Sequence, residues 1–294
     1  MRIMPKVPAP FSYRRPEGVS VKEHALACAQ KLDDIIVQTG SEHVLAFIME
    51  PVGGLATGAL VAPDCYYKAI RDICTKHGVL LIFDEVMSGA GRTGTFLSAE
   101  HWPDARPDLV TLAKGVAAGY TPLASVLAPN HIIEPILATG GFLHGHTYSA
   151  NPLSCAVGAA VVDEMLRMDL MTNAREIGAF LMDGLKRIAE STEIIGDIRG
   201  KGLLMAVELV ADKETKAMIP AVHRAAYRLL EIGISNGLLL YTRKTAAGKY
   251  GEWVMITPPL TMSREEADEL LTLFQRSIQE FERELTKDGA LRAA

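Results

Sequence analysis

The sequence predicts an α/β protein, in which a mostly parallel sheet is sandwiched by helices and a smaller α+β domain follows. Short apolar runs rich in strand-forming residues occur at residues 44–49 and 79–83, as expected for strands buried in a parallel sheet. A helical pattern separates these runs, so strand, helix and strand form a βαβ unit. The alternation changes later in the chain, and we predict domains at residues 1–165 and 166–294.

The composition is that of a globular protein with no polyanionic partner. The 294 residues are 49% hydrophobic and 22% charged, which is enough to bury a substantial core. A net charge of −5 without a basic block argues against nucleic-acid binding. The four cysteines have neither metal-site nor disulfide spacing, so we expect a reducing cytoplasm. We expect no signal peptide and no membrane span.

Two helices are predicted in the first 80 residues. Residues 1–20 are rich in Pro and Arg and should form an irregular lead-in. A helix should follow at residues 21–38, because apolar residues recur there with helical spacing. Its predicted buried face consists of Ala25, Leu26, Ala29, Leu32 and Ile36. A second helix should begin at Asp64 and end at Gly78, because glycine commonly ends helices.

Acidic residues follow both predicted strands. The run at residues 44–49 is followed by Glu50, and the run at residues 79–83 is followed by Asp84. In an open α/β sheet, ligands bind at the carboxyl ends of the strands. Both carboxylates should therefore lie at the functional edge of one sheet.

A lysine should reach the same edge. Lys114 follows another apolar run, at residues 109–113. An acid and a lysine at one edge suit pyridoxal phosphate, whose aldehyde reacts with a lysine amine and whose pyridine nitrogen needs an acidic partner. Each residue taken alone has a structural alternative, since Asp84 could cap a turn or helix and Lys114 could be a solvated helix end.

The later elements are predicted from the same signals. A strand is expected at residues 124–128, and residues 140–152 are too rich in Gly and polar residues to form a core element. Helical sequence extends from residue 152 to about residue 190, with a break near Asp169. The second domain should contain strands at residues 203–210, 238–241 and 253–257, a helix at residues 221–236, and a final helix with a capping box formed by Ser263 and Glu266.

The residues around the acid and the lysine closely resemble a known family. Residues 84–94 read DEVMSGAGRTG, and residues 111–115 read TLAKG. This spaced pattern resembles the class III pyridoxal-phosphate aminotransferases of fold type I, which include amine and ω-amino acid transaminases. The likeness extends from about Pro5 to the C-terminus.

The resemblance also implies that part of the family's sheet is missing. Family members carry a helix start that cradles the cofactor phosphate, well upstream of the glutamate matched by Glu50. Residues 39–42, with the sequence TGSE, imitate its composition. They precede a strand, however, which is the wrong context for a phosphate-binding helix start. The chain therefore resembles a family member that lacks its N-terminal part, with an incomplete sheet.

The family's catalytic roles carry over to two residues. By resemblance, Lys114 binds the cofactor aldehyde and, once a substrate amine displaces it, moves a proton between the substrate carbon and the cofactor carbon. Asp84 keeps the ring nitrogen protonated, which makes the ring an electron sink.

Four more residues are expected around the cofactor by resemblance. Val86 packs on the ring, and Glu50 lies near the acid cluster. Met87 stands where many members have Gln, and it has no N–H to donate to the ring hydroxyl. Thr147 resembles the threonine that reaches the phosphate of the other subunit's cofactor, which implies a homodimer with shared sites.

Other positions separate this chain from parts of the family. Leu55 stands where the ornithine and γ-aminobutyrate branches carry a gating Glu, and Met255 stands where they carry an Arg. A substrate carboxylate would then need another cation, and Arg243 and Lys249 are candidates that are equally plausible as solvated loop charges. Arg92 matches the arginine of the family's GRTG run, and we interpret it as a structural ion pair. The C-terminal pattern is more similar to the amine:pyruvate branch.

Two classes of function follow from the sequence. The first is a transaminase that moves an amino group from an amine or ω-amino acid to a 2-oxo acid such as pyruvate. The second is a catalytically silent remnant or partner subunit of a class III aminotransferase. A family aminomutase or decarboxylase is a third possibility within the enzyme class.

Overall fold

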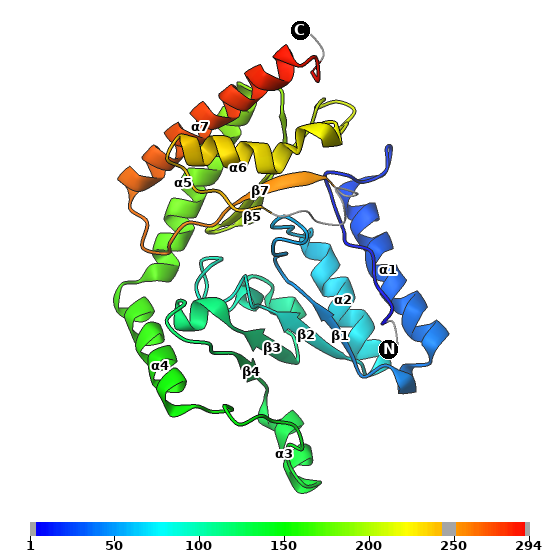
Figure 1. Cartoon of the computed structure of the whole chain (residues 1–294). Helices are drawn as coiled ribbons and strands as arrows, with labels where there is room; N and C mark the ends of the chain where they lie inside the picture. The colour runs from blue at the N-terminus through cyan, green and yellow to red at the C-terminus, as the bar shows by residue number, and fades with distance from the viewer. Residues whose placement is uncertain (1–3, 243–250, 292–294) are drawn as a thin grey trace. The chain divides into compact units, whose positions relative to one another are not determined.

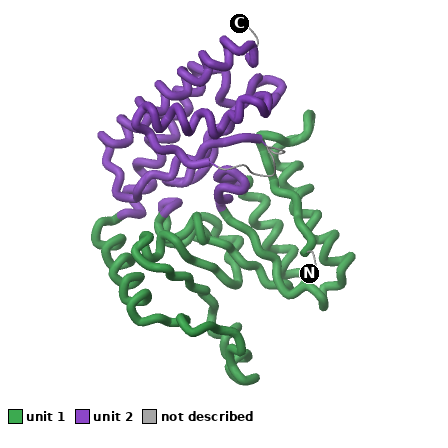
Figure 2. Tube along the Cα trace, viewed as in Figure 1, with its two compact units in different colours: residues 1–51, 62–91, 95–169 green, residues 52–61, 92–94, 170–294 purple. Residues whose placement is uncertain are grey.

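A computed structural model describes residues 4–242 and 251–291. The chain forms two compact units, shown green and purple in Figure 2. Unit 1 comprises Met1–Pro51, Ala62–Gly91 and Thr95–Asp169, and unit 2 comprises Val52–Val61, Arg92–Gly94 and Leu170–Ala294. Two short segments from the first third of the chain therefore belong to unit 2.

Unit 1 is built around a four-stranded sheet with the order β1-β2-β3-β4 (Figure 1). Strands β1 (Ala46–Met49), β2 (Leu80–Asp84) and β3 (Leu109–Leu112) are parallel, and β4 (Ser125–Leu127) is antiparallel to β3. All four strands form where the sequence predicts them, to within two residues. The predicted α/β class with a mostly parallel sheet is confirmed.

Helices α1 (Val21–Thr39) and α2 (Asp64–His77) pack against each other in unit 1. Both were predicted, and Gly78 ends α2 in the left-handed conformation. The buried face of α1 consists of Ala25, Cys28, Ala29, Leu32 and Ile36. Leu26 was predicted on this face but is exposed. The reason is geometric, because Cys28 continues the i, i+3, i+4 stripe and Leu26 lies about 100° away from Ala25 around the helix.

The predicted burial of the strands on both faces is wrong. Leu81 and Phe83 of β2 are fully buried, but the residues that alternate with them are only half-buried. Ile48 of β1, at an edge of the described sheet, is 57% exposed. Successive side chains of a strand point to opposite faces, so in unit 1 one face of these strands is well covered and the other is not.

The rest of unit 1 is less regular. The short 3₁₀ helices η1 (Ser41–His43), η2 (Ser98–His101), η3 (Pro103–Ala105) and η4 (Lys114–Ala117) lie between its regular elements, and α3 (Asn130–Ala138) and α4 (Pro152–Arg167) follow. Helix α3 was not predicted, because Pro135 lies inside it and proline disfavours a helix interior. The segment predicted as a loop, residues 140–152, is irregular up to Asn151, and Pro152 is the first residue of α4.

Unit 2 has its own antiparallel sheet and core. Strands β5 (Ile195–Lys201), β6 (Leu204–Leu209) and β7 (Glu252–Ile256) lie in that order, with helices α5 (Leu170–Glu190), α6 (Ala225–Ser235) and α7 (Arg264–Lys287). The capping box of Ser263 and Glu266 at the start of α7 is confirmed. The predicted break near Asp169 is also confirmed, because α4 and α5 are separate helices and Asp169 has a φ of 50°.

Three predictions for unit 2 need correction. Strand β5 was not predicted, because its apolar residues are interrupted by Gly196 and Gly200. The strand predicted at residues 238–241 does not form, and only Tyr241 makes an isolated bridge, to Met255. The helix predicted at residues 221–236 is broken by Arg224, whose left-handed backbone separates η5 (Ala221–His223) from α6.

Two further findings concern the cysteines and membranes. All four cysteines are free thiols. Among the described helices, none combines the length and the apolar character that crossing a bilayer requires.

Candidate active site

The parallel strands of unit 1 bring the predicted acids and lysine to one edge of the sheet. Met49 of β1 pairs with Phe83 of β2, so Glu50 and Asp84 follow at the same level. Asp84 in turn pairs with Thr111 of β3, and Lys114 lies three residues beyond Thr111. Three neighbouring strands therefore present a carboxylate, a carboxylate and an amine at their carboxyl ends, where α/β sheets bind ligands.

The Asp84 side chain is held by its own turn. Its Oδ1 atom accepts a hydrogen bond from the Val86 N–H at 3.1 Å, and the Thr111 hydroxyl lies 3.5 Å from the same atom. Within the described part of the chain, Oδ2 makes no hydrogen bond. The carboxylate is thus oriented through one oxygen and keeps the other for a ligand.

Lys114 has an unusual backbone. It lies at the start of η4 with a φ of 46°, which few residues other than glycine adopt. Such strain persists where the surrounding structure imposes it, and it is common at functional sites. A Cβ atom on Gly115 would approach the Cβ atom of Ala90 to 3.1 Å, so the turns after β2 and β3 pack closely. The Lys114 side chain is exposed, and its amine has no partner among the described residues.

Glu85, directly after Asp84, was not predicted from the sequence to have a role. Its side chain is buried, and its two oxygens accept hydrogen bonds from the N–H groups of Ser98 at 2.5 Å and Ala99 at 2.7 Å. Burial raises the pKa of Glu85 to about 7, against the opposing effect of these two N–H groups. The signal in the sequence was a second acid directly after Asp84. Glu85 joins the two ends of the loop that leaves the site.

The other predicted cofactor residues lie in two separate segments. Val86 and Met87 are half-buried in the turn that follows Asp84. This turn is closed by a hydrogen bond of 2.9 Å from the Gly89 N–H to the Glu85 carbonyl. Thr147 lies in the exposed segment between α3 and α4. The described chain brings Glu50, Asp84, Val86 and Met87 to one region and does not bring Thr147 into contact with them.

The prediction that Arg92 forms an ion pair is wrong. Its guanidinium donates to the carbonyl oxygens of Leu203, at 3.3 Å, and Pro258. None of the described carboxylates lies within ion-pair distance of it, and burial lowers the pKa of Arg92. The reason is its local environment in unit 2, which offers backbone carbonyls in place of carboxylates.

The positions that separate this chain from other branches have structural roles here. Leu55 and Met255 are buried in unit 2. The two candidate carboxylate-binding cations, Arg243 and Lys249, lie outside the described residues.

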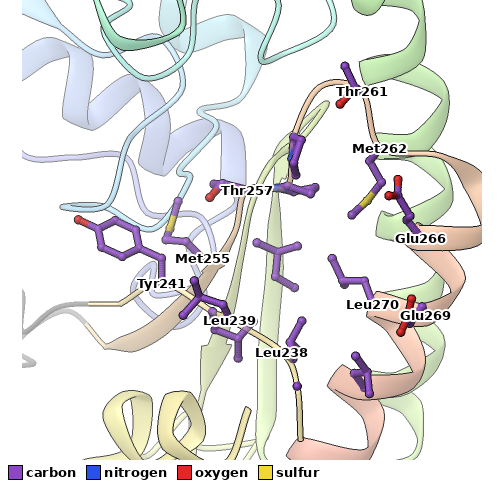
Figure 3. A pocket seen from close by; sticks show the side chains of 16 residues that line it. Leu238, Leu239, Tyr241, Met255, Thr257, Thr261, Met262, Glu266, Glu269 and Leu270 are labelled. Atoms are coloured by element: carbon purple, nitrogen blue, oxygen red, sulfur yellow. The ribbon is translucent and has the colours of Figure 1, made fainter. Parts of the chain in front are cut away.

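Unit 2 contains a pocket of about 670 Å³ between residues 237–241, the end of β7 and the start of α7 (Figure 3). Its lining is mostly apolar, with Glu266 and Glu269 from α7. Glu266 already accepts the Ser263 N–H in the capping box. The pocket includes none of the predicted catalytic or cofactor-binding residues, so we do not assign it to the chemistry.

The residues at the sheet edge fit the ring and aldehyde of pyridoxal phosphate. Asp84 offers the unbonded Oδ2, and Lys114 offers an unbonded amine at the neighbouring strand end. A phosphate cradle was not expected at residues 39–42. In the structure these residues span the C-terminal end of α1 and the start of the three-residue η1, which precedes β1.

Comparison with known proteins gives a family match over most of the chain. A sequence model of the family described as "Aminotransferase class-III" matches residues 3–278. The uncharacterized aminotransferase YodT of Bacillus subtilis is 37% identical over 97% of this chain and 64% of its own length. The diaminobutyrate–2-oxoglutarate transaminase of Halomonas elongata is 35% identical over 97% of this chain and 61% of its own length. The putrescine–pyruvate aminotransferase of Pseudomonas aeruginosa is 32% identical over 92% of this chain and 57% of its own length.

A solved structure gives the same result for the fold. An amine transaminase from an uncultivated Pseudomonas species, crystallised in its PLP-bound form, superimposes with a TM-score of 0.83 at 34% identity. The match covers 92% of this chain and 60% of that protein. The chain thus spans roughly three-fifths of the length of the relatives it matches.

Proposed function

Since this chain belongs to the class III aminotransferases, whose members depend on pyridoxal phosphate, we propose that it moves an amino group from an amine or ω-amino acid to a 2-oxo acid such as pyruvate. The observation that carries the proposal is the register of β2 and β3, which sets Asp84 and Lys114 at adjacent strand ends. The unbonded Oδ2 of Asp84 and the unbonded amine of Lys114 support it further, within the described residues.

Each residue of the site has a defined task in the proposed reaction. When bound, pyridoxal phosphate supplies an aldehyde that reacts with amines and a ring that withdraws electrons. Lys114 would hold this group through its amine. Once a substrate amine takes that place, the free Lys114 amine would be the base that removes a proton from the substrate carbon and then carries that proton as an acid. Asp84 would keep a proton on the ring nitrogen through Oδ2.

The surrounding residues complete the proposed cofactor site. Val86 packs on the ring, and Met87 lies beside it without donating a hydrogen bond. Glu50 adds a second carboxylate at the neighbouring strand end. These roles come from the family resemblance, and the positions of the three residues at one sheet edge support them.

The proposed partner is a second copy of the chain. Thr147 of the partner subunit contacts the cofactor phosphate in this proposal. Its segment supports the idea, because Phe142, Leu143 and Tyr148 are apolar and at least 65% exposed. We also propose that residues 1–165 and 166–294 act as the large and small domains of the subunit, in the cytoplasm.

The proposed donor class rests on one substitution, and the acceptor rests on branch similarity. Leu55 stands in place of the gating Glu of other branches, which favours amines over ornithine-like donors. The relatives differ in acceptor, since one is named for pyruvate and another for 2-oxoglutarate. Paired assays with both acceptors and the same amine decide between them. We expect higher kcat/KM with pyruvate.

Cofactor addition to the purified full chain tests the proposal. We expect a new visible absorbance band, and borohydride should then attach the cofactor to the peptide that contains Lys114. The Lys114→Ala variant should show neither result. A folded circular-dichroism spectrum without cofactor binding would instead support the catalytically silent remnant. Binding without amine transfer, but with carbon dioxide release or amino-group migration, would support a decarboxylase or aminomutase.

A further inference from the structure

Unit 2 contains a loop from the first third of the chain, Val52–Val61, whose sequence begins two residues after Glu50. We infer that Arg199 of β5 is a positioning residue that fixes this loop and, through it, Glu50. The consequence for cofactor binding rests on the proposed function, whereas the structural claim does not.

The tip of the loop is held by two side chains of the unit 2 sheet. Arg199 donates from Nε to the Gly58 carbonyl at 2.7 Å and from a terminal nitrogen to the Thr57 carbonyl at 3.4 Å. Trp253 of β7 donates from Nε1 to the Leu55 carbonyl at 2.9 Å. Three carbonyls of a four-residue stretch are therefore bound by side chains from two different strands.

The tip of the loop is closely packed against Trp253 and Arg199. Gly58 has a φ of 61°, and a Cβ atom there would lie 2.6 Å from the Trp253 ring and 2.7 Å from Arg199. The Arg199 guanidinium also lies 5.3 Å from the centre of the Trp253 ring. Arginine, tryptophan and the loop backbone thus form one closely packed contact inside unit 2.

Two carboxylates orient the arginine for this task. The other terminal nitrogen of Arg199 donates to Asp197 at 2.9 Å and to Glu208, whose side chain is fully buried. The planar guanidinium can bind carboxylates along one edge and carbonyls along another. A lysine has a single nitrogen on a flexible stem and does not reproduce this geometry. The arrangement therefore specifies arginine.

The neck of the loop is closed independently. The Tyr67 hydroxyl accepts a hydrogen bond from the Ala62 N–H at 3.0 Å and donates to the Pro51 carbonyl at 2.7 Å. Inside the loop, Val52 bridges Val61, and the Gly53 N–H donates to the Leu60 carbonyl at 2.8 Å.

A loop fixed at both neck and tip transmits little backbone freedom to the residue before it. The residues directly before the loop are Glu50 and Pro51, which follow β1. Glu50 lies at the same level of the sheet as Asp84. Loss of the tip contact should loosen the loop most and Glu50 less, because Tyr67 still holds the neck. Arg199 would then affect the site without touching substrate or cofactor.

Hydrogen–deuterium exchange on full-length variants tests the structural claim. Arg199→Lys keeps the charge but loses the fork, and Trp253→Phe keeps the ring but loses the donor to Leu55. We expect each to speed exchange at the Gly53 and Ala59 amides at least tenfold. Arg228→Ala is the matched control, because Arg228 pairs with Glu284 and Glu231 in the same unit and has no contact with the loop. It should leave loop exchange unchanged.

Cofactor titration of the same variants tests the functional claim. We expect Arg199→Lys to weaken pyridoxal-phosphate binding about fivefold or more, with Arg228→Ala unchanged. Unaltered loop exchange in folded Arg199→Lys would overturn the inference. Faster exchange with unaltered affinity would overturn its link to the site. If the wild-type chain binds no cofactor, the proposed function fails, and the exchange result still decides the role of Arg199.

Discussion

Two regions of this chain treat their apolar residues very differently. In unit 2, all six residues of β6 are buried, and the core combines side chains from three helices and three strands. In unit 1, the segment of residues 120–168 leaves large apolar side chains exposed, and α3 has no buried residue. These exposed residues are Tyr120, Val126, Leu127, Leu137, Phe142, Leu143, Tyr148, Leu153, Leu166 and Met168.

This difference in burial indicates which region chiefly stabilises the fold and which region is available for interactions. The core of unit 2 is closely covered, although Val222 and Leu239 of that unit are exposed. The 120–168 segment instead leaves most of its large apolar side chains exposed, as is common at protein–protein interaction sites. Unit 1 also carries the acids and the lysine at the end of its sheet. Mutations in the core of unit 2 should therefore chiefly lower stability, and mutations of Lys114 and Asp84 in unit 1 should chiefly lower activity with little change in folding.

The largest expected effect is at Lys114. Lys114→Ala should abolish amine transfer, because no other described residue at the β3 end supplies an amine. The side chain is exposed and unbonded within the described chain, so the free energy of unfolding should change by less than about 0.5 kcal/mol. Activity assays and urea denaturation of the same protein measure both effects. Retained turnover would place the chemistry elsewhere.

The core of unit 2 should give the next largest effect. Phe274→Ala removes a fully buried ring and should cost about 3–5 kcal/mol of unfolding free energy. Leu143→Ala, at a side chain that is 96% exposed, should cost less than about 0.5 kcal/mol in the monomer.

Tryptophan fluorescence can report on unit 2 separately. Trp253 lies in unit 2 and Trp102 in unit 1. Denaturation followed through Trp253, in a Trp102→Phe background, measures the Phe274 effect where it occurs. Equal costs for Phe274→Ala and Leu143→Ala would remove the contrast between the two regions.

Substitution of Asp84 should lower the catalytic rate less than substitution of Lys114, but more than substitution of the residues around it. Asp84→Asn keeps the shape and removes the charge that we propose to hold a proton on the ring nitrogen. We expect kcat to fall by about 10²–10³, or about 3–4 kcal/mol of barrier, as for other electrostatic catalytic groups. Thr111→Val is a control, since its hydroxyl lies 3.5 Å from the same carboxylate and its loss should have a small effect. A normal rate in Asp84→Asn would contradict the assigned role.

The sheet edge could be predicted from sequence because its signals are local. Apolar runs ending at Glu50, Asp84 and Lys114 set the strand ends, and parallel pairing then determines that the three meet. The hydrogen-bond acceptors of Arg92 are carbonyl groups of unit 2 residues more than 100 positions away. A local sequence pattern does not contain this information. The clamp of Arg199 on Gly58 is equally long-range. Strand β5 was not predicted because its glycines interrupt the apolar alternation that is typical of a strand.

Glu85 shows the same limit at the site itself. Its neighbour Asp84 was predicted because it ends a strand, but burial of Glu85 depends on the chain returning to place Ser98 and Ala99 against it. A sequence pattern gives the position of an acid, whereas its pKa depends on what surrounds it in the folded chain.

The raised pKa of Glu85 predicts a pH dependence of stability in unit 1. With a pKa of about 7 in the folded chain and about 4.3 in the unfolded chain, the folded state binds more protons between these values. Stability should therefore fall as pH rises from about 4.5 to about 7, by up to about 3.5 kcal/mol, and should level off above pH 7. Glu85→Gln should remove this slope, although its amide NH₂ would face an N–H group and lower stability at every pH. Urea denaturation of wild type and variant from pH 5 to pH 8 measures the difference in slope, with Glu17→Gln as the control on an exposed carboxylate of unit 1. Parallel curves for wild type and Glu85→Gln would mean that Glu85 ionises in the folded chain as readily as in water, and that the two N–H groups compensate fully for its burial.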